Sequence, residues 1–190
     1  TRTWTFTDAC GNVSIPVTQI ITVNDDIAPV FAVPPAAVTV QCIGDVPAPT
    51  MLGYTDNCDA AGSVLGTDGP LVGGNCGGMI TRTWTTTDAC GNVSISVTQI
   101  ITVNDNIPPV FAAQPAAVTV QCIGDVPAPT MLGYTDNCDA AGSVLGTDGP
   151  LVGGNCGGTI TRTWTTTDAC GNVSIPVTQI ITVNDDIAPV

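Results

Sequence analysis

Short runs of threonine, valine and isoleucine alternate with polar residues along the whole chain. Glycine, proline, asparagine and aspartate interrupt these runs about every ten residues. An alternation with a period of two places successive side chains on opposite faces and indicates half-buried β-strands. Evenly spaced short strands with turn residues between them are typical of a β-sandwich. We therefore predict an all-β fold of immunoglobulin-like sandwiches and no helix of useful length.

Within residues 29–108 the pattern predicts strands separated by turn-rich loops. They are expected at residues 37–42, 50–55, 63–66, 80–87 and 93–103. The last two are joined by a tight turn at residues 88–92, DACGN, whereas residues 67–78 are glycine-rich and expected to be irregular.

One of these strands carries the only tryptophan of its segment. Ile80, Arg82 and Trp84 share one face, and a row of threonines occupies the other. We expect Trp84 to enter the core together with Tyr54 and Phe31. Arg82 is expected at the rim of that face, paired with an aspartate. We interpret the threonine row as a solvated strand face rather than an ice- or glycan-binding surface.

The pattern repeats every 80 residues, because TRTWT begins at Thr1, Thr81 and Thr161. We interpret residues 29–108 and 109–188 as two complete repeats, residues 1–28 as the C-terminal part of a preceding repeat, and residues 189–190 as the start of the next. We expect a segment of a longer, extended array that resembles beads on a string. The complete repeats differ at six positions: Val33/Ala113, Pro34/Gln114, Met79/Thr159, Ser96/Pro176, Asn106/Asp186 and Pro108/Ala188.

Each complete repeat carries four cysteines. They are Cys42, Cys58, Cys76 and Cys90 in the first repeat and Cys122, Cys138, Cys156 and Cys170 in the second. An even number in so small a unit indicates disulfides and an oxidising, extracellular setting. A zinc site is disfavoured because the sequence has no histidine and no C-x-x-C. Cys10 is the ninth cysteine, and its partner is expected upstream.

Four cysteines allow three pairings within a repeat. The TDNC and TDAC loops each end a strand, and in an immunoglobulin-like sandwich the loop after the second strand and the loop before the last lie at one end. This placement favours a bridge between the two loops. The favoured pairs are Cys58–Cys90 and Cys42–Cys76 in the first repeat, and Cys138–Cys170 and Cys122–Cys156 in the second.

The charge of the chain excludes several functions. The sixteen acidic residues are all aspartate, the only bases are Arg2, Arg82 and Arg162, and the net charge is −13. We therefore expect no electrostatic binding to nucleic acid or anionic membranes, and no membrane insertion. The absence of histidine, lysine and glutamate removes most general bases, so we predict no enzyme.

Aspartate and asparagine side chains gather, in the predicted fold, where the linker from one repeat enters the next. Calcium takes about 6–8 oxygen ligands, largely carboxylates and carbonyls, and so fits such a cluster. We predict a Ca²⁺ ion that stiffens each junction; the alternative is that these aspartates cap turns through their own backbone. The candidate ligands are Asn24, Asp25, Asp26, Asp56, Asp59, Asp88, Asn92, Asn104, Asp105, Asn106, Asp136, Asp139, Asp168 and Asn172.

The motif T-x-T-W-T-x-T-D-A-C-G-N, followed by a strand and an Asp-x-x-Pro-Pro linker, resembles the HYR (hyalin-repeat) family of immunoglobulin-like modules. More closely, it is similar to the cysteine-bearing version arrayed in giant surface adhesins of Bacteroidota, including gliding-motility adhesins. The linker from Val103 to Phe111 is similar to the calcium linker of cadherins but lacks that family's Glu ligand and D-x-D pair. The HYR resemblance implies an extracellular, adhesive or scaffolding role at a bacterial cell surface, without catalysis.

Two functions follow from these observations. The first is a structural stalk or filament segment, in which each repeat contacts only its neighbours in the same chain. A tip domain outside this segment would then bind surface glycans or other cells. The alternative is a multivalent module in which every repeat binds a glycan or protein, with avidity from the array. The candidate binding surface for that alternative is the glycine-rich segment at residues 67–78.

Overall fold

The computed structural model describes residues 1–154 and 156–188, and the expected start of a further repeat at residues 189–190 lies outside them. The described residues form short β-strands and two single 3₁₀ turns, η1 (Ile43–Asp45) and η2 (Ile123–Asp125). The all-β prediction is confirmed. Neither turn has the length or apolar character that crossing a membrane would require.

The chain divides into two compact units, and the boundary between them runs through the first repeat. One unit comprises Thr1–Pro34, Met51–Gly66 and Trp84–Val97. The other comprises Pro35–Thr50, Thr67–Thr83 and the chain from Thr98 onward. The second unit therefore holds the complete second repeat together with those parts of the first repeat that lead into it.

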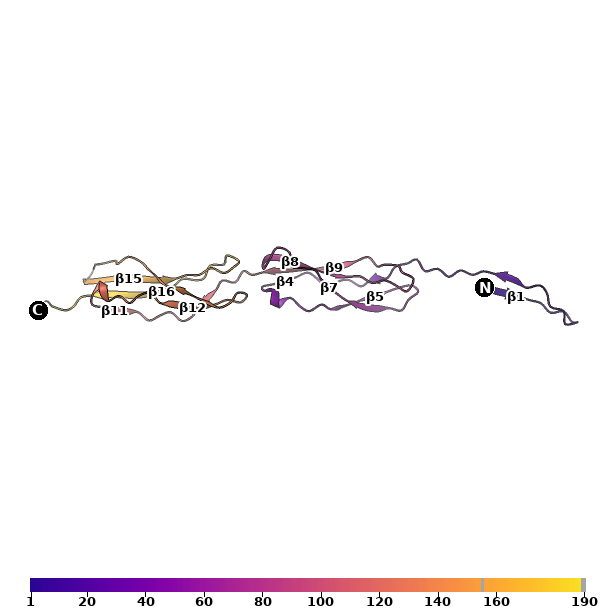
Figure 1. The fold of residues 1–190 in the computed structure, drawn as a ribbon, viewed down its shortest axis with the longest axis horizontal. Coiled ribbons are helices and arrows are strands. Elements are labelled where there is room, and N and C mark those ends of the chain that lie inside the picture. Colours follow the sequence, from indigo (N-terminus) through magenta and orange to yellow (C-terminus); the bar gives the residue numbers. More distant parts are fainter. Residues whose placement is uncertain (155, 189–190) are drawn as a thin grey trace. The chain divides into compact units, whose positions relative to one another are not determined.

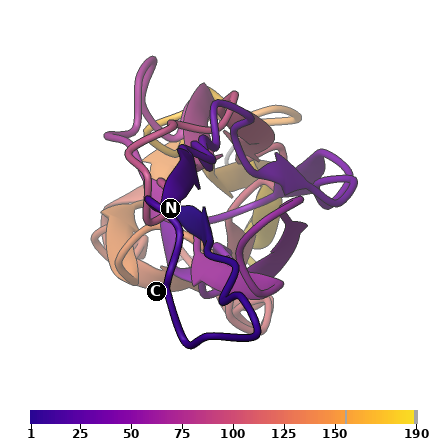
Figure 2. The ribbon, with the colours of Figure 1, turned by 90° about the vertical axis from the view of Figure 1, so that its right-hand side faces the viewer.

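The second repeat is built from one sheet of three strands, ordered β10-β12-β13, and one of four, ordered β11-β16-β15-β14 (Figure 1). This is the arrangement predicted for an immunoglobulin-like sandwich. The strands lie horizontally in Figure 1, and Figure 2 shows the same ribbon turned by 90° about the vertical axis. They are β10 (Val110–Phe111), β11 (Val118–Val120), β12 (Met131–Thr135), β13 (Gly142–Leu145), β14 (Thr147–Asp148), β15 (Cys156–Trp164) and β16 (Val177–Asn184).

The first repeat has the same strands in the same order, β3-β5-β6 and β4-β9-β8-β7. They are β3 (Val30–Phe31), β4 (Val38–Val40), β5 (Met51–Thr55), β6 (Gly62–Leu65), β7 (Thr67–Asp68), β8 (Cys76–Trp84) and β9 (Val97–Asn104). Residues 1–28 contribute the antiparallel pair β1 (Arg2–Trp4) and β2 (Val17–Gln19).

One strand pair in each four-stranded sheet is parallel, which the sequence pattern did not predict. In the second repeat β11 pairs with β16, from Val118 opposite Ile181 to Val120 opposite Val183. At the same end of the sheet, β15 begins at Cys156 opposite Asn184, the last residue of β16. Strand pairing thus gathers the end of β11, the start of β15 and the outgoing chain at one end of the repeat.

The predicted alternation of faces along β8 and β15 is confirmed. Ile160, Arg162 and Trp164 are buried, and Trp164 donates its indole N–H to the carbonyl of Thr130 at 2.9 Å. Trp84 is likewise fully buried, as predicted. Besides the two tryptophans, the core residues shared by both repeats are aliphatic residues of the four-stranded sheet: Ile80, Ile101 and Val103, and their counterparts Ile160, Ile181 and Val183.

Two details of the predicted core are wrong. Phe31 and Tyr54 are only half-buried and pack edge to face, with ring centroids 6.0 Å apart. Arg82 is not at the rim but is 2% exposed. Its guanidinium can be buried because it donates to both carboxylate oxygens of Asp68, at 2.6 and 2.9 Å, and to the carbonyls of Pro47 and Ala48.

Candidate functional site at the repeat junction

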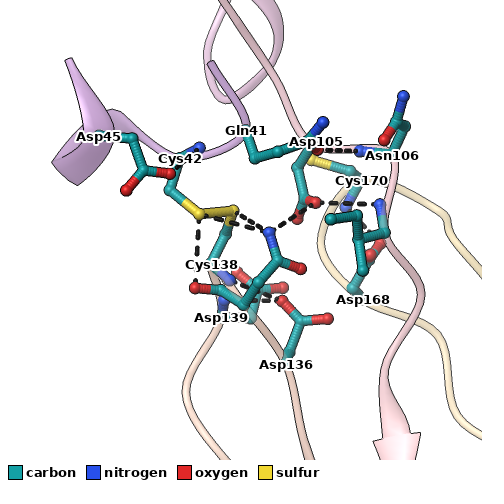
Figure 3. The surroundings of a disulfide bond; sticks show 12 residues. Gln41, Cys42, Asp45, Asp105, Asn106, Asp136, Cys138, Asp139, Asp168 and Cys170 are labelled. Carbon is teal, nitrogen blue, oxygen red and sulfur yellow. Dashed lines mark hydrogen bonds between the residues drawn. A yellow bond between two sulfur atoms is a disulfide. The ribbon is translucent and has the colours of Figure 1, made fainter. Parts of the chain in front are cut away.

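Two disulfides join the first repeat to the second. Cys42 is bonded to Cys138 (Figure 3). Cys76 is bonded to Cys170, and the Cα–Cα distance is 5.2 Å in each bridge. The bonded residues are 96 and 94 positions apart in the sequence. Each bridge therefore spans more than one 80-residue period and crosses the junction.

The favoured pairing within each repeat is wrong. Cys58–Cys90, Cys42–Cys76, Cys138–Cys170 and Cys122–Cys156 are not formed, and the cysteines left free and exposed are Cys10, Cys58, Cys90, Cys122 and Cys156. The physical reason lies in the topology. The cysteines expected to pair do share one end of a repeat, but at the described junction each of them meets a cysteine of the adjacent repeat instead.

Strand order explains which cysteines meet. Cys42 follows β4 and Cys76 opens β8, so both lie where β9 ends and the first repeat passes into its linker. Cys138 follows β12, whose last residue Thr135 pairs with the first residue of β10, where the second repeat begins. Cys170 lies in the turn between β15 and β16, at the end opposite Cys156.

Aspartates shape the two loops that carry Cys138 and Cys170. Asp136 accepts hydrogen bonds through Oδ1 from the backbone N–H groups of Cys138 and Asp139, both at 2.9 Å. Asp168 does the same for Cys170 and Asn172, both at 2.8 Å. A short carboxylate that accepts from the backbone a few residues ahead closes a tight turn. These turns hold the cysteines in place at the junction.

Asp105 of the linker ties the two repeats together without a covalent bond. It is 5% exposed, and its backbone N–H donates to the carbonyl of Asn75 at 3.1 Å. Its carbonyl accepts from the side-chain amide of Asn172 at 3.2 Å, and its Oδ1 accepts from that of Asn137 at 3.3 Å. Asn75 belongs to the first repeat and the two other asparagines to the second.

The entry of the first repeat is built in the same way. Asp25 accepts from Asn57 through Oδ1 at 3.3 Å and from Asn92 through its carbonyl at 3.2 Å. Asp25, Asp56 and Asp88 each place one carboxylate oxygen within 4.8 Å of the others. Three ligands of this kind are available to a cation.

Some of these carboxylate oxygens are buried and have no hydrogen-bond partner among the residues that the structure describes. They are Oδ2 of Asp25 and Oδ2 of Asp56 at the first entry, and Oδ2 of Asp136 at the second. A buried, unpaired carboxylate oxygen is costly unless a donor or cation satisfies it. The donor set and the unsatisfied oxygens thus both fit a hard divalent cation.

The other residues proposed as ligands have different roles in the structure. Asp59 and Asp139 bridge the two loops by accepting from the backbone N–H of Ala89 and Ala169 at 2.7 and 2.8 Å. Asn92 and Asn172 use their amide nitrogens as donors, to Asp88 and Asp168 at 2.7 Å in each case. Asn24 and Asp26 are exposed and lie outside the carboxylate triad of the first entry. At the second entry, Asn104 ends β9 and Asn106 donates its backbone N–H to Gln41.

Sequence reasoning missed four polar residues of the junction. Asn57 and Asn137 donate to the linker aspartates, Asn75 supplies a carbonyl, and Gln41 accepts from the backbone N–H of Asn106 at 3.1 Å. The asparagine in TDNC was a usable signal because it repeats with the cysteine. Gln41 and Asn75 had no comparable sequence signal, except that they lie next to Cys42 and Cys76.

Hydrogen bonds and charge shift the ionisation of the groups at the first entry. Burial opposes ionisation of Asp88, but its pKa falls below the usual range because Asn92 and the backbone N–H groups of residues 90–92 donate to it. Partial desolvation raises the pKa of the exposed Cys58 thiol, and the carboxylates of Asp25 and Asp56 add to the rise. The pKa of Cys90 rises for the same reasons, desolvation first.

The glycine-rich segment proposed as a binding surface is fixed to the junction. Val72 pairs with Met79 in an isolated bridge, and Gly73 and Gly74 have positive φ angles of 97° and 76°. Cys76, two residues after Gly74, is bonded to Cys170. These observations favour the role of a loop held by its disulfide.

The family described as "HYR-like domain with 4 cysteines" matches residues 30–103 and 110–183. Searches of curated proteins and of solved structures found no significant match. Members of this family are non-enzymatic repeat modules, and disulfide-bonded tandem repeats fit an extracellular protein. From the two consecutive matches and the four cysteines in each, the chain belongs to the family of HYR-like domains with four cysteines.

Proposed function

We propose that this chain is a structural segment of a long extracellular adhesin, in which near-identical repeats act as spacers. The observation that carries the proposal is the junction, where two disulfides and the contacts of Asp105 couple one repeat to the next. A spacer needs a strong connection between neighbours and no ligand site of its own. The resemblance to adhesins of Bacteroidota, including those of gliding motility, supports a place at a bacterial cell surface.

A Ca²⁺ ion at each junction is part of this proposal. Asp25, Asp56 and Asp88 would supply carboxylate ligands at the first entry, and Asp105, Asp136 and Asp168 occupy the equivalent positions at the second. Support comes from the buried, unpaired oxygens of Asp25, Asp56 and Asp136. A bound cation would offset the repulsion between neighbouring carboxylates and stiffen the linker.

Calorimetric titration of the full chain with CaCl₂ tests the metal site. We expect binding that Asp56→Asn weakens at least tenfold at the first entry, because a neutral amide replaces a charged ligand. Asp26→Asn is the matched control, since this linker carboxylate is exposed and outside the triad. Absence of calcium binding by the wild-type chain would refute this part of the proposal.

Binding assays on the same chain test the spacer role itself. The labelled chain is applied in solution to a glycan array. In a second assay the chain is immobilised and exposed to whole bacterial and host cells. We expect no retention above that of an unrelated acidic protein, because a tip domain outside this segment would carry the binding site. Saturable binding to one glycan or cell type would instead favour the multivalent binding module.

A further inference from the structure

The connectivity of the junction disulfides has a mechanical consequence. Within a repeat, the cysteine that faces the preceding repeat lies close in sequence to one that faces the following repeat. Cys58 is 16 residues after Cys42, and Cys90 is 14 residues after Cys76. The same spacings separate Cys122 from Cys138 and Cys156 from Cys170.

We propose that the junction disulfides carry tension from repeat to repeat along two covalent tracks, so that force bypasses most of the chain within each repeat. This inference rests on the proposed role as a structural segment. In the described junction the tracks are Cys42–Cys138 and Cys76–Cys170. They make the connection between repeats independent of the five linker residues that lie between Asn104 at the end of β9 and Val110 at the start of β10.

The free cysteines extend these tracks in both directions. Cys58 and Cys90 are exposed and occupy the positions of the bonded Cys138 and Cys170. Cys122 and Cys156 are exposed and occupy the positions of the bonded Cys42 and Cys76. The partner that fits each end is a repeat of this same sequence, because it presents the complementary two cysteines.

Each new bridge forms by oxidation of two thiols. One S–S bond forms, two protons are released, and two electrons pass to a disulfide oxidant such as glutathione disulfide, which is reduced to two thiols. The same balance applies to the two bridges already present at the junction.

A repeat with disulfides at both ends can lengthen only a little when it is pulled. Within a repeat, each track follows the chain between two cysteines, such as Cys122 and Cys138. A stretch of about 16 residues extends to roughly 55 Å at most, whereas the 80 residues of a whole repeat extend to roughly 280 Å. One of the tracks includes β15, which is already an extended strand reaching from Cys156 toward the turn that holds Cys170. Tension applied through the cysteines therefore meets a nearly taut path, and the rest of the repeat is shielded.

Single-molecule pulling of the full chain from its two ends tests the proposal. The free thiols are first blocked with iodoacetamide. The shortest covalent path then runs through Cys42–Cys138 and bypasses a stretch of chain with a sequence separation of 96. We expect a fully stretched contour roughly 330 Å shorter than that of the chain reduced with dithiothreitol.

Variants separate the two tracks. The double variant Cys42→Ser, Cys138→Ser should keep nearly all of the shortening, because Cys76–Cys170 still omits 94 positions. Further replacement of Cys76 and Cys170 by serine should restore the full contour. Cys10→Ser is the control and should change nothing, because this cysteine is free. Contour length depends on covalent connectivity alone, so a variant that folds poorly still gives a result.

The outcome is distinguishable from failure of the spacer role. A contour that does not respond to dithiothreitol, or a shortening of roughly 240 Å as expected for bridges closed inside each repeat, would overturn the two-track proposal. Either result would leave the glycan and cell binding assays, and hence the spacer role, unaffected.

Discussion

Arg82 and its counterpart Arg162 are charged side chains that the fold buries almost completely. Each is 2% exposed and forms two hydrogen bonds to one aspartate and two to backbone carbonyls. The alternation of residues along the strand predicted that Arg82 shares a face with Trp84. It could not predict burial, because the carbonyls of Pro47 and Ala48 come from a segment with no strand pattern.

Replacing Asp68 by asparagine keeps the size of the side chain and removes its charge. The buried guanidinium of Arg82 then lacks its counter-ion, and we expect the free energy of unfolding to fall by about 3 kcal/mol. Urea unfolding of Asp68→Asn beside the wild type measures the loss, with Asp26→Asn as a control at an exposed carboxylate. Equal stability of all three proteins would show that the ion pair contributes nothing.

The same pair makes stability depend on pH. The hydrogen bond from Arg82 holds the pKa of Asp68 below its usual range, against the opposing effect of burial. A lowered folded pKa gives stability that is present above the unfolded value of about 3.9 and lost as the pH falls through the folded value. The gap in stability between wild type and Asp68→Asn should therefore narrow below about pH 4. Urea midpoints at pH 7, 4 and 3 would contradict this if the gap stayed constant.

Strands β5 and β6 lie within a residue of their predicted bounds, whereas β8 and β15 begin earlier than expected. Residues 76–78 were assigned to the irregular loop because glycine carries no side chain to show an alternation. In the structure they are the first residues of β8, and Cys76 among them forms a junction disulfide. The parallel pairing of β4 with β9 was also unpredictable, because it depends on contacts between residues more than sixty positions apart.

Gly158 of β15 is expected to tolerate no side chain. A Cβ atom there would lie 2.2 Å from the carbonyl oxygen of Gly154 and 3.0 Å from that of Val152, and neither backbone atom can easily move. Gly158→Ala should lower the free energy of unfolding by about 2 kcal/mol or more. Gly124→Ala is the matched control, because no atom of the described residues lies within 4 Å of its Cβ position. Thermal unfolding of the two variants compares them directly. Similar melting temperatures would contradict the close approach of the Gly154 and Val152 backbone to Gly158.

At the scale of the whole molecule, the sequence predicted the repeat, the cysteine-bearing ends and the gathering of aspartates, but not the disulfide pairing. Four cysteines per period pair evenly within a repeat or between repeats, so their number does not distinguish the two. The predicted placement of Cys58 and Cys90 at one end of the repeat is confirmed, because Asp59 beside Cys58 accepts from the backbone N–H of Ala89 beside Cys90. The pairing depends on how two repeats meet, and near-identical copies give no signal for that.

The central claim, that neighbouring repeats are covalently coupled, is tested most directly by mapping the disulfides of the unreduced chain with a protease that cleaves before aspartate. The peptide of residues 68–87 carries Cys76, and Met79 distinguishes it from the equivalent peptide of the second repeat. The peptide of residues 168–184 carries Cys170, and Pro176 distinguishes it from the equivalent peptide of the first repeat. Mass spectrometry should find these two peptides linked to each other. Linkage of residues 68–87 to residues 26–44, which carry Cys42, would show that the bridges close inside a repeat and would contradict the account.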